Sequence, residues 1–89
     1  MSSEDLSPFP GFDRLQRAAE RRRTLMAELA AKRRELGLSQ TTVAARMGTS
    51  QSTVARLESG ADDVRLSSIE RYADAVGQEV AWRLQEGGV

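Results

Sequence analysis

A group of polar side chains near the middle of the chain can donate and accept hydrogen bonds. Gln51, Ser52, Thr53 and Arg56 lie in the segment QSTVARLE. Glutamine can make two hydrogen bonds to an adenine edge, arginine can make two to a guanine edge, and hydroxyl groups bond to bases or phosphates. We therefore predict base contacts from this segment, with the alternative that its polar residues only face water.

Catalysis and cofactor binding are poorly supported by the residue types present. The 89 residues include no cysteine and no histidine. Thiolate metal sites, imidazole ligands and the commonest general base at neutral pH are therefore absent. Asp62 and Asp63 are adjacent carboxylates, but neighbouring residues in a loop usually face water. We expect no enzymatic activity, no cofactor and no metal site.

The ends of the chain and its hydropathy favour a cytoplasmic protein. No apolar run approaches the roughly 20 residues that cross a bilayer. The first residues, MSSEDLSPFPGF, lack the basic start and apolar stretch of a secretion signal. We expect a soluble cytoplasmic protein that does not bind membranes.

Charge is unevenly distributed although the formal net charge is zero. The basic residues between positions 14 and 34 outnumber Glu20 and Glu28, and they are Arg14, Arg17, Arg21, Arg22, Arg23, Lys32, Arg33 and Arg34. Both flanking regions are acidic. This basic run is either a solvated helix face or a surface for a protein partner. For the second interpretation, we name Arg14, Arg17, Arg21 and Arg22 as the partner-binding residues.

Apolar spacing predicts a helix between Asp13 and Leu36, followed by Gly37 as its C-cap. Arg22 and Arg23 interrupt the apolar stripe. The segment is therefore either one long helix or an outer helix followed by a core helix from about Thr24. Residues 1–12 contain prolines, serines and a glycine, and they are predicted to form a flexible arm.

Capping serines and helix-ending glycines predict three further helices. Ser39 is a suitable N-cap for a helix over residues 40–47, and Ser50 is one for a helix over residues 51–58. Gly48 and Gly60 end these helices. A fourth helix begins at Ser67 or Ser68 and ends at Gly77. The inward-facing residues are predicted to be Val43, Ala44, Met47, Val54, Leu57, Ile69, Tyr72, Ala73 and Val76.

In the final segment, EVAWRLQ, the spacing of apolar residues changes from the helical period to alternation. Val80, Trp82 and Leu84 alternate with less apolar residues, which favours a β-strand over a fifth helix. A single strand cannot satisfy its backbone groups, so this strand implies pairing with a second chain. We predict that Val80, Trp82 and Leu84 form a dimer interface. The alternative for Trp82 is a place in the core of the monomer.

The helices over residues 40–47 and 51–58 form a unit with a short linker, Gly48-Thr49-Ser50. Such a short turn forces a steep crossing between the helices. Val54 and Leu57 then anchor the second helix and leave its polar face exposed. This arrangement suits a helix that enters the DNA major groove while the preceding helix crosses the backbone.

The segment LGLSQTTVAARMGTSQSTVARLESG resembles the Cro/C1-type helix-turn-helix family, also called the XRE family. The resemblance rests on Ser39-Gln40, Val43-Ala44, Met47-Gly48, residues 50–54 and residues 57–60. It implies base contacts from the helix over residues 51–58 and phosphate contacts from Gln40, Thr41 and Ser50. It also implies that Gln40 braces the recognition helix and that Glu58 has a structural role.

One departure from the family concerns the residues after Gly60. Many relatives carry basic residues there, whereas this chain has Ala61-Asp62-Asp63. Phosphate contacts would then involve Arg46, Arg65 or the basic first helix, or the affinity would be weak.

The resemblance implies a lambda-repressor-like bundle of four to five helices with an N-terminal helical extension and a C-terminal β-strand. The predicted division is a flexible arm over 1–12, a helix-turn-helix domain over 13–78, and a dimerisation element over 79–89. The function expected is a dimeric, sequence-specific DNA-binding repressor on a palindromic operator. The extra elements look like the HigA-type antitoxin branch, so the alternatives are a toxin-neutralising antitoxin or a regulator that docks on another protein.

Overall fold

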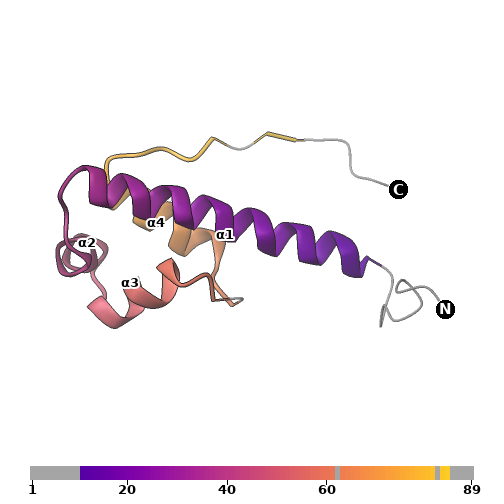
Figure 1. The fold of residues 1–89 in the computed structure, drawn as a ribbon, viewed down its shortest axis with the longest axis horizontal. Coiled ribbons are helices and arrows are strands. Elements are labelled where there is room, and N and C mark those ends of the chain that lie inside the picture. Colours follow the sequence, from indigo (N-terminus) through magenta and orange to yellow (C-terminus); the bar gives the residue numbers. More distant parts are fainter. Residues whose placement is uncertain (1–10, 62, 82, 85–89) are drawn as a thin grey trace.

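A computed structural model of the chain describes residues 11–61, 63–81 and 83–84. It consists of helices α1 (Phe12–Glu35), α2 (Gln40–Met47), α3 (Gln51–Glu58) and α4 (Leu66–Ala75). Figure 1 shows that the N-terminal part of the long helix α1 extends beyond the other helices. The predicted mainly helical fold class is confirmed. No helix in this described part of the chain is long and apolar enough to cross a membrane.

Helix α1 is continuous, so the alternative of two shorter helices is wrong. No proline or glycine interrupts residues 12–35, and most residues between the apolar positions are strong helix formers. All the buried residues of α1 lie in its second half, namely Met26, Leu29 and Ala30. The first half, residues 12–25, is about 21 Å long at the usual helical rise and contributes no fully buried residue, although Leu25 at its end packs against the core. We call residues 12–25 the outer half of α1.

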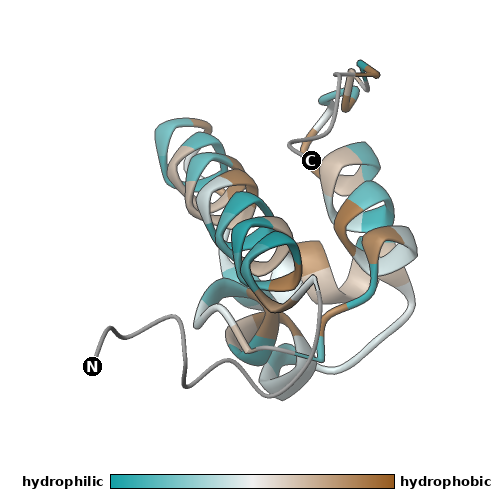
Figure 2. Ribbon diagram, turned by 90° about the vertical axis from the view of Figure 1, so that its right-hand side faces the viewer, coloured by the Kyte–Doolittle hydropathy of each residue, from teal (hydrophilic) through white to brown (hydrophobic). Residues whose placement is uncertain are grey.

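The hydrophobic core lies where the inner half of α1 meets the other helices. Figure 2 shows α1 and α4 on opposite sides, with the two short helices below them. Val43, Val54, Ile69 and Tyr72 are completely buried. The inward-facing residues predicted from the spacing are all buried. Each helix after α1 thus buries one face and leaves the opposite face available for contacts.

Helix α4 begins earlier than predicted. Its first residue is Leu66, and its N-cap is Arg65 rather than a serine. The carbonyl oxygen of Arg65 accepts hydrogen bonds from the backbone N–H groups of Ser68 and Ile69, at 3.0 and 3.2 Å. These bonds close the first turn around Leu66, so neither Ser67 nor Ser68 caps the helix.

The segment after α4 forms neither the predicted strand nor the alternative fifth helix at residues 78–81 and 83–84. Val80 is half-buried and packs against the core, whereas Leu84 is fully exposed. Trp82 lies outside the described residues. The physical reason for the missing strand is that a β-strand needs hydrogen bonds to a neighbouring strand, and no strand exists elsewhere in the described part of this chain.

Candidate nucleic-acid interface

Helices α2 and α3 are both capped by the predicted serines. The Ser39 hydroxyl accepts a hydrogen bond from the Thr42 backbone N–H at 3.0 Å, and Ser50 accepts one from the Thr53 backbone N–H at 3.2 Å. Gly48 ends α2 with φ +72°, a left-handed conformation that favours glycine. Only Thr49 and Ser50 remain between Gly48 and α3, so α3 begins almost at once. The local sequence therefore specifies this helix pair.

Helix α3 has one buried side and one exposed polar side. Val54 and Leu57 are buried in the core at 0% and 5% exposure. Gln51, Ser52 and Arg56, together with Thr53, are exposed. The structure thus places all the predicted base-contacting residues on the surface of one helix. We call this exposed set, Gln51, Ser52, Thr53 and Arg56, the α3 surface.

The hydroxyl groups at the start of α3 form a small cluster. Ser50 Oγ lies 3.0 Å from Ser52 Oγ and 2.9 Å from Thr53 Oγ1, within hydrogen-bonding distance of both. A hydroxyl group donates one hydrogen bond and accepts up to two. Ser52 and Thr53 therefore keep free hydrogen-bonding capacity for a base or a phosphate while the cluster stays intact.

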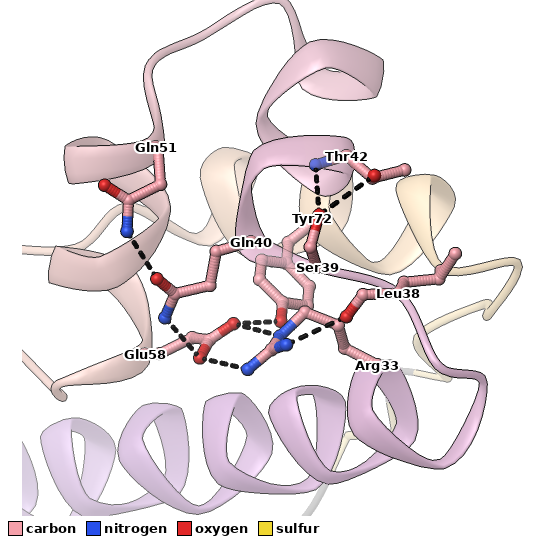
Figure 3. Close-up of polar contacts among 8 residues, drawn as sticks. All are labelled: Arg33, Leu38, Ser39, Gln40, Thr42, Gln51, Glu58 and Tyr72. Atoms are coloured by element: carbon pink, nitrogen blue, oxygen red, sulfur yellow. Dashed lines mark hydrogen bonds and ion pairs between the residues drawn. The ribbon is translucent and has the colours of Figure 1, made fainter.

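Gln40 links α2 to α3, as the resemblance implied. Gln51 Nε2 donates to Gln40 Oε1 at 2.5 Å, and Gln40 Nε2 donates to Glu58 Oε1 at 3.0 Å. Figure 3 shows this chain of contacts running from the tip of α3 back to its last turn. The Gln51 amide is consequently held in one orientation before any ligand arrives, which lowers the entropy cost of a specific contact.

Glu58 sits at the centre of a polar network that joins all of the helices. Arg33 Nε and Nη2 donate to its two carboxylate oxygens at 2.7 and 3.1 Å, and the Tyr72 hydroxyl donates to it at 2.5 Å. Arg33 Nη1 also donates to the Leu38 carbonyl oxygen at 2.9 Å. The side chains of Arg33 and Glu58 are only 11% and 10% exposed. The network (Figure 3) therefore fixes α3 against α1 and α4.

The protonation states of this network follow from its geometry. Burial acts to raise the pKa of the Glu58 carboxyl group, but hydrogen bonds from Arg33, Tyr72 and Gln40 outweigh burial and lower that pKa. Burial, followed by the hydrogen bond to Glu58, raises the pKa of the Tyr72 hydroxyl. Glu58 is therefore an anion and Tyr72 a neutral donor at neutral pH.

Sequence reasoning did not identify Arg33 and Tyr72 as supports of this site. The sequence places Arg33 within the basic run and Tyr72 on the apolar face of the fourth helix. A usable signal existed, because Arg33 follows Met26 and Leu29 at the spacing of one helix face. A charged residue on a buried helix face requires a partner, and Glu58 is that partner.

The predicted phosphate-contacting residues are dispersed around α2 and α3. Thr41 and Ser50 are exposed at the starts of these helices. Arg46 instead donates to the Ala75 carbonyl oxygen at 2.9 Å, while Arg71 donates to the Met47 carbonyl oxygen at 2.5 Å. These arginines cap the C-terminal ends of α4 and α2, where a positive charge is favourable.

Two further arginines flank the end of α3. Arg65 is exposed at the N-cap of α4. Arg56 pairs with Asp63, whose carboxylate Oδ2 lies 2.5 Å from Arg56 Nη2. The hydrogen bond from Arg56 lowers the pKa of Asp63, so the carboxylate stays ionised at neutral pH.

The predicted partner-binding arginines lie on the outer half of α1. Arg14, Arg17 and Arg21 are exposed, and Arg22 is half-buried. Leu15 is 57% exposed on the same segment. In the part of the chain that the structure describes, no group of His, Cys, Asp or Glu residues has the arrangement of a metal site.

Comparisons with known proteins give a family match and curated relatives. The helix-turn-helix family matches residues 29–83. Antitoxin HigA1 of Mycobacterium tuberculosis, from strains CDC 1551 / Oshkosh and ATCC 25618 / H37Rv, is 39% identical over 74 residues, which are 83% of this chain and 50% of the relative. The chain thus spans about half the length of the curated relatives it matches. No solved structure gave a significant match.

Proposed function

The chain belongs to the helix-turn-helix family of DNA-binding transcription regulators, and from this premise we propose that it is a sequence-specific repressor that binds double-stranded DNA as a dimer. The observation that carries the proposal is the α3 surface, which is polar and exposed while the opposite side of α3 is buried. Such a helix can enter a major groove with its polar side while its apolar side stays packed in the core.

In this proposal, Gln51 and Arg56 read base edges and the hydroxyl groups of Ser52 and Thr53 assist them. Glutamine matches the donor and acceptor pair of adenine, and arginine matches the two acceptors of guanine. Support comes from the order already present at Gln51, whose amide is bonded to Gln40.

Phosphate contacts are proposed for the N-terminal ends of α2 and α3. The first backbone N–H groups of a helix lack carbonyl partners inside the helix, and they carry a partial positive charge. Gln40, Thr41 and Ser50 lie at these ends. Arg65 is a further candidate because it is exposed beside α3, whereas Arg46 would have to use donors not bonded to Ala75.

Dimerisation is proposed through the segment after α4, residues 79–89. Leu84 is fully exposed and Val80 is only half-buried, so the described part of this segment leaves apolar surface uncovered. A two-fold dimer presents its recognition helices to half-sites about 34 Å apart. Trp82→Ala or truncation after Gly77 should give a monomer by sedimentation equilibrium. A dimer of unchanged mass in both variants would contradict this part of the proposal.

The test of DNA binding is selection from a pool of randomised duplexes with the purified full chain, followed by footprinting. We expect the recovered duplexes to share an inverted repeat and the footprint to cover both half-sites. Gln16→Ala is the control and should select the same sites, since Gln16 is an uncharged, exposed residue on the outer half of α1. Recovery of unrelated sequences by the wild-type chain would contradict sequence-specific binding.

A second candidate function is that of an antitoxin that binds a toxin and represses its own operon. It is favoured by the 39% identity to Antitoxin HigA1 and by the outer half of α1, which contributes no buried residue to the core. Arg14, Arg17, Arg21 and Arg22 would contact acidic residues of the partner in this function.

The antitoxin proposal is tested with the product of the gene adjacent to the one encoding this chain. Co-expression should relieve any growth arrest that this product causes, and replacing all four arginines by glutamate should abolish the relief. The four-glutamate variant should still bind DNA, whereas Gln51→Ala should still relieve the arrest. Full relief by the four-glutamate variant would exclude these arginines from the contact.

A further inference from the structure

An ion pair at the edge of the α3 surface joins a proposed base-reading residue to an acidic loop. Arg56 Nη2 donates to Asp63 Oδ2 at 2.5 Å, and the two side chains are 60% and 64% exposed. The contact spans only the turn between α3 and α4. Both groups therefore lie at the surface that would face DNA if Arg56 reads a base.

The loop that carries Asp63 is held on both sides. Gly60 turns the chain with φ +80°, and a Cβ atom there would lie 3.1 Å from the Arg23 side chain, so the turn packs closely against α1. Ala61 is half-buried, and Val64 packs against the core. Asp63 is thus presented to Arg56 by residues that contact the body of the protein.

We propose that Asp63 is a specificity-determining residue, which holds the Arg56 guanidinium so that it donates to a guanine edge in preference to a phosphate. This inference rests on the proposed function of DNA binding. Asp63 itself makes no base contact in this role; it acts through Arg56 as a positioning residue.

The chemical basis is a difference between the two acceptors that Arg56 meets on DNA. A guanidinium group has five N–H donors, and Asp63 occupies one donor of Nη2. The remaining donors can still bond O6 and N7 of guanine, which are uncharged acceptors. A phosphate oxygen carries negative charge and is repelled by the neighbouring carboxylate. Asp63 therefore weakens phosphate binding by Arg56 more than guanine binding.

Side-chain order acts in the same direction. A free arginine side chain loses rotamer entropy when one geometry is fixed. The ion pair with Asp63 restricts Arg56 before DNA arrives, so part of this entropy loss precedes binding. Phosphate contacts carry no sequence information, whereas base contacts do. Restricting Arg56 therefore increases the difference in affinity between DNA sequences more than it increases the affinity for DNA in general.

The test compares Asp63→Asn with wild type on three duplexes: a site selected by the wild-type chain, the same site with the guanine opposite Arg56 replaced, and a scrambled sequence. Asparagine keeps the size and an acceptor oxygen but removes the charge. Glu28→Gln is the control, because it removes an exposed carboxylate from α1.

We expect Asp63→Asn to tighten binding to the scrambled duplex by up to about fivefold, the upper end of the range for an exposed ion pair. Binding to the selected site should tighten less, so the ratio of the two affinities falls, and replacing the guanine should matter less than in wild type. In an Arg56→Ala background, Asp63→Asn should leave the ratio unchanged. Glu28→Gln should not alter it in either background.

Equal tightening on all three duplexes in the wild-type background would overturn the proposal, because Asp63 would then only repel DNA in general. No change on any duplex would overturn it as well. A failure of the proposed DNA-binding function gives a different result. In that case the wild-type chain itself would bind the selected and the scrambled duplex equally well, and both proposals would be wrong.

Discussion

The α3 surface and the outer half of α1 are both exposed and polar, but they are built in different ways. Gln51 on α3 is bonded to Gln40, which is bonded to the largely buried Glu58 side chain, so Gln51 is connected to a network that reaches α1 and α4. The outer half of α1 contributes no buried residue to the core. A preorganised surface suits specific contacts, whereas a projecting helix suits a partner that supplies the missing packing.

The largest effect should come from breaking the network beneath α3. Glu58→Ala leaves the Arg33 guanidinium nearly buried without its partner, so the free energy of unfolding should fall by about 3–5 kcal/mol. Urea denaturation of the two proteins measures this difference. Glu28→Ala on α1 is the control and should change the free energy by less than about 0.5 kcal/mol. A small effect of Glu58→Ala would show that the network contributes little to holding α3.

Local signals in the sequence predicted the α2–α3 unit well. Ser39 and Ser50 cap the helices that follow them, because capping depends on residues within one turn. The Arg33–Glu58 pair was not predicted, since its partners are 25 positions apart and Arg33 lies among other basic residues. The acidic residues after Gly60 lead to a predicted phosphate contact for Arg46, but its hydrogen bond to Ala75 depends on how α4 packs on α2.

The segment after α4 shows another limit of sequence patterns. Alternation of Val80, Trp82 and Leu84 predicts a strand, but a strand forms only where another strand pairs with it. The periodicity describes which side chains share a face; it does not supply the partner. The base-contacting, phosphate-contacting and dimer-interface assignments likewise remain predictions, because each depends on a molecule other than this chain.

A second prediction concerns the turn that sets the crossing of α2 and α3. Gly48→Ala forces a left-handed conformation on a residue with a Cβ atom, so the free energy of unfolding should fall by about 1–2 kcal/mol. Apart from its own chain neighbours, nothing lies within 4 Å of the added Cβ position, so the cost comes from the backbone. Thermal unfolding measured by circular dichroism checks this, with Ala45→Gly as a helix-interior comparison. An unchanged melting temperature for Gly48→Ala would mean that the turn relaxes without cost.

A third prediction uses the lowered pKa of Glu58. Its folded-state pKa lies below the unfolded value of about 4.3, so its ionised form stabilises the fold above that pH. This stability is lost as pH falls through the folded-state pKa, because the unfolded chain binds the proton first. Below about pH 4.5, the free energy of unfolding should therefore rise with increasing pH. For one proton, the slope is at most about 1.4 kcal/mol per pH unit.

Glu58→Gln should reduce this slope, whereas Asp63→Asn should reduce it less, since the Arg56–Asp63 pair is exposed. Urea denaturation at several pH values between 2 and 6 gives the slopes. Identical slopes for wild type and Glu58→Gln would contradict the assignment to Glu58.

The smallest effect is expected on the outer half of α1. Arg17→Ala should change the free energy of unfolding by less than about 0.5 kcal/mol, because Arg17 is exposed and the segment contributes nothing buried. The same urea measurement applies. A decrease in the free energy of unfolding as large as that of Glu58→Ala would contradict the difference proposed between the α3 surface and the outer half of α1.

The central claim is that the α3 surface reads bases, and Gln51→Ala tests it most directly. Its affinities for a selected site and for a scrambled duplex should be measured at the same salt concentration, beside wild type and the exposed-glutamine control Gln16→Ala. Loss of the two hydrogen bonds to adenine should weaken binding to the selected site by about 1–3 kcal/mol and leave binding to the scrambled duplex nearly unchanged. Equal weakening on both duplexes, or no weakening on either, would contradict base reading by Gln51.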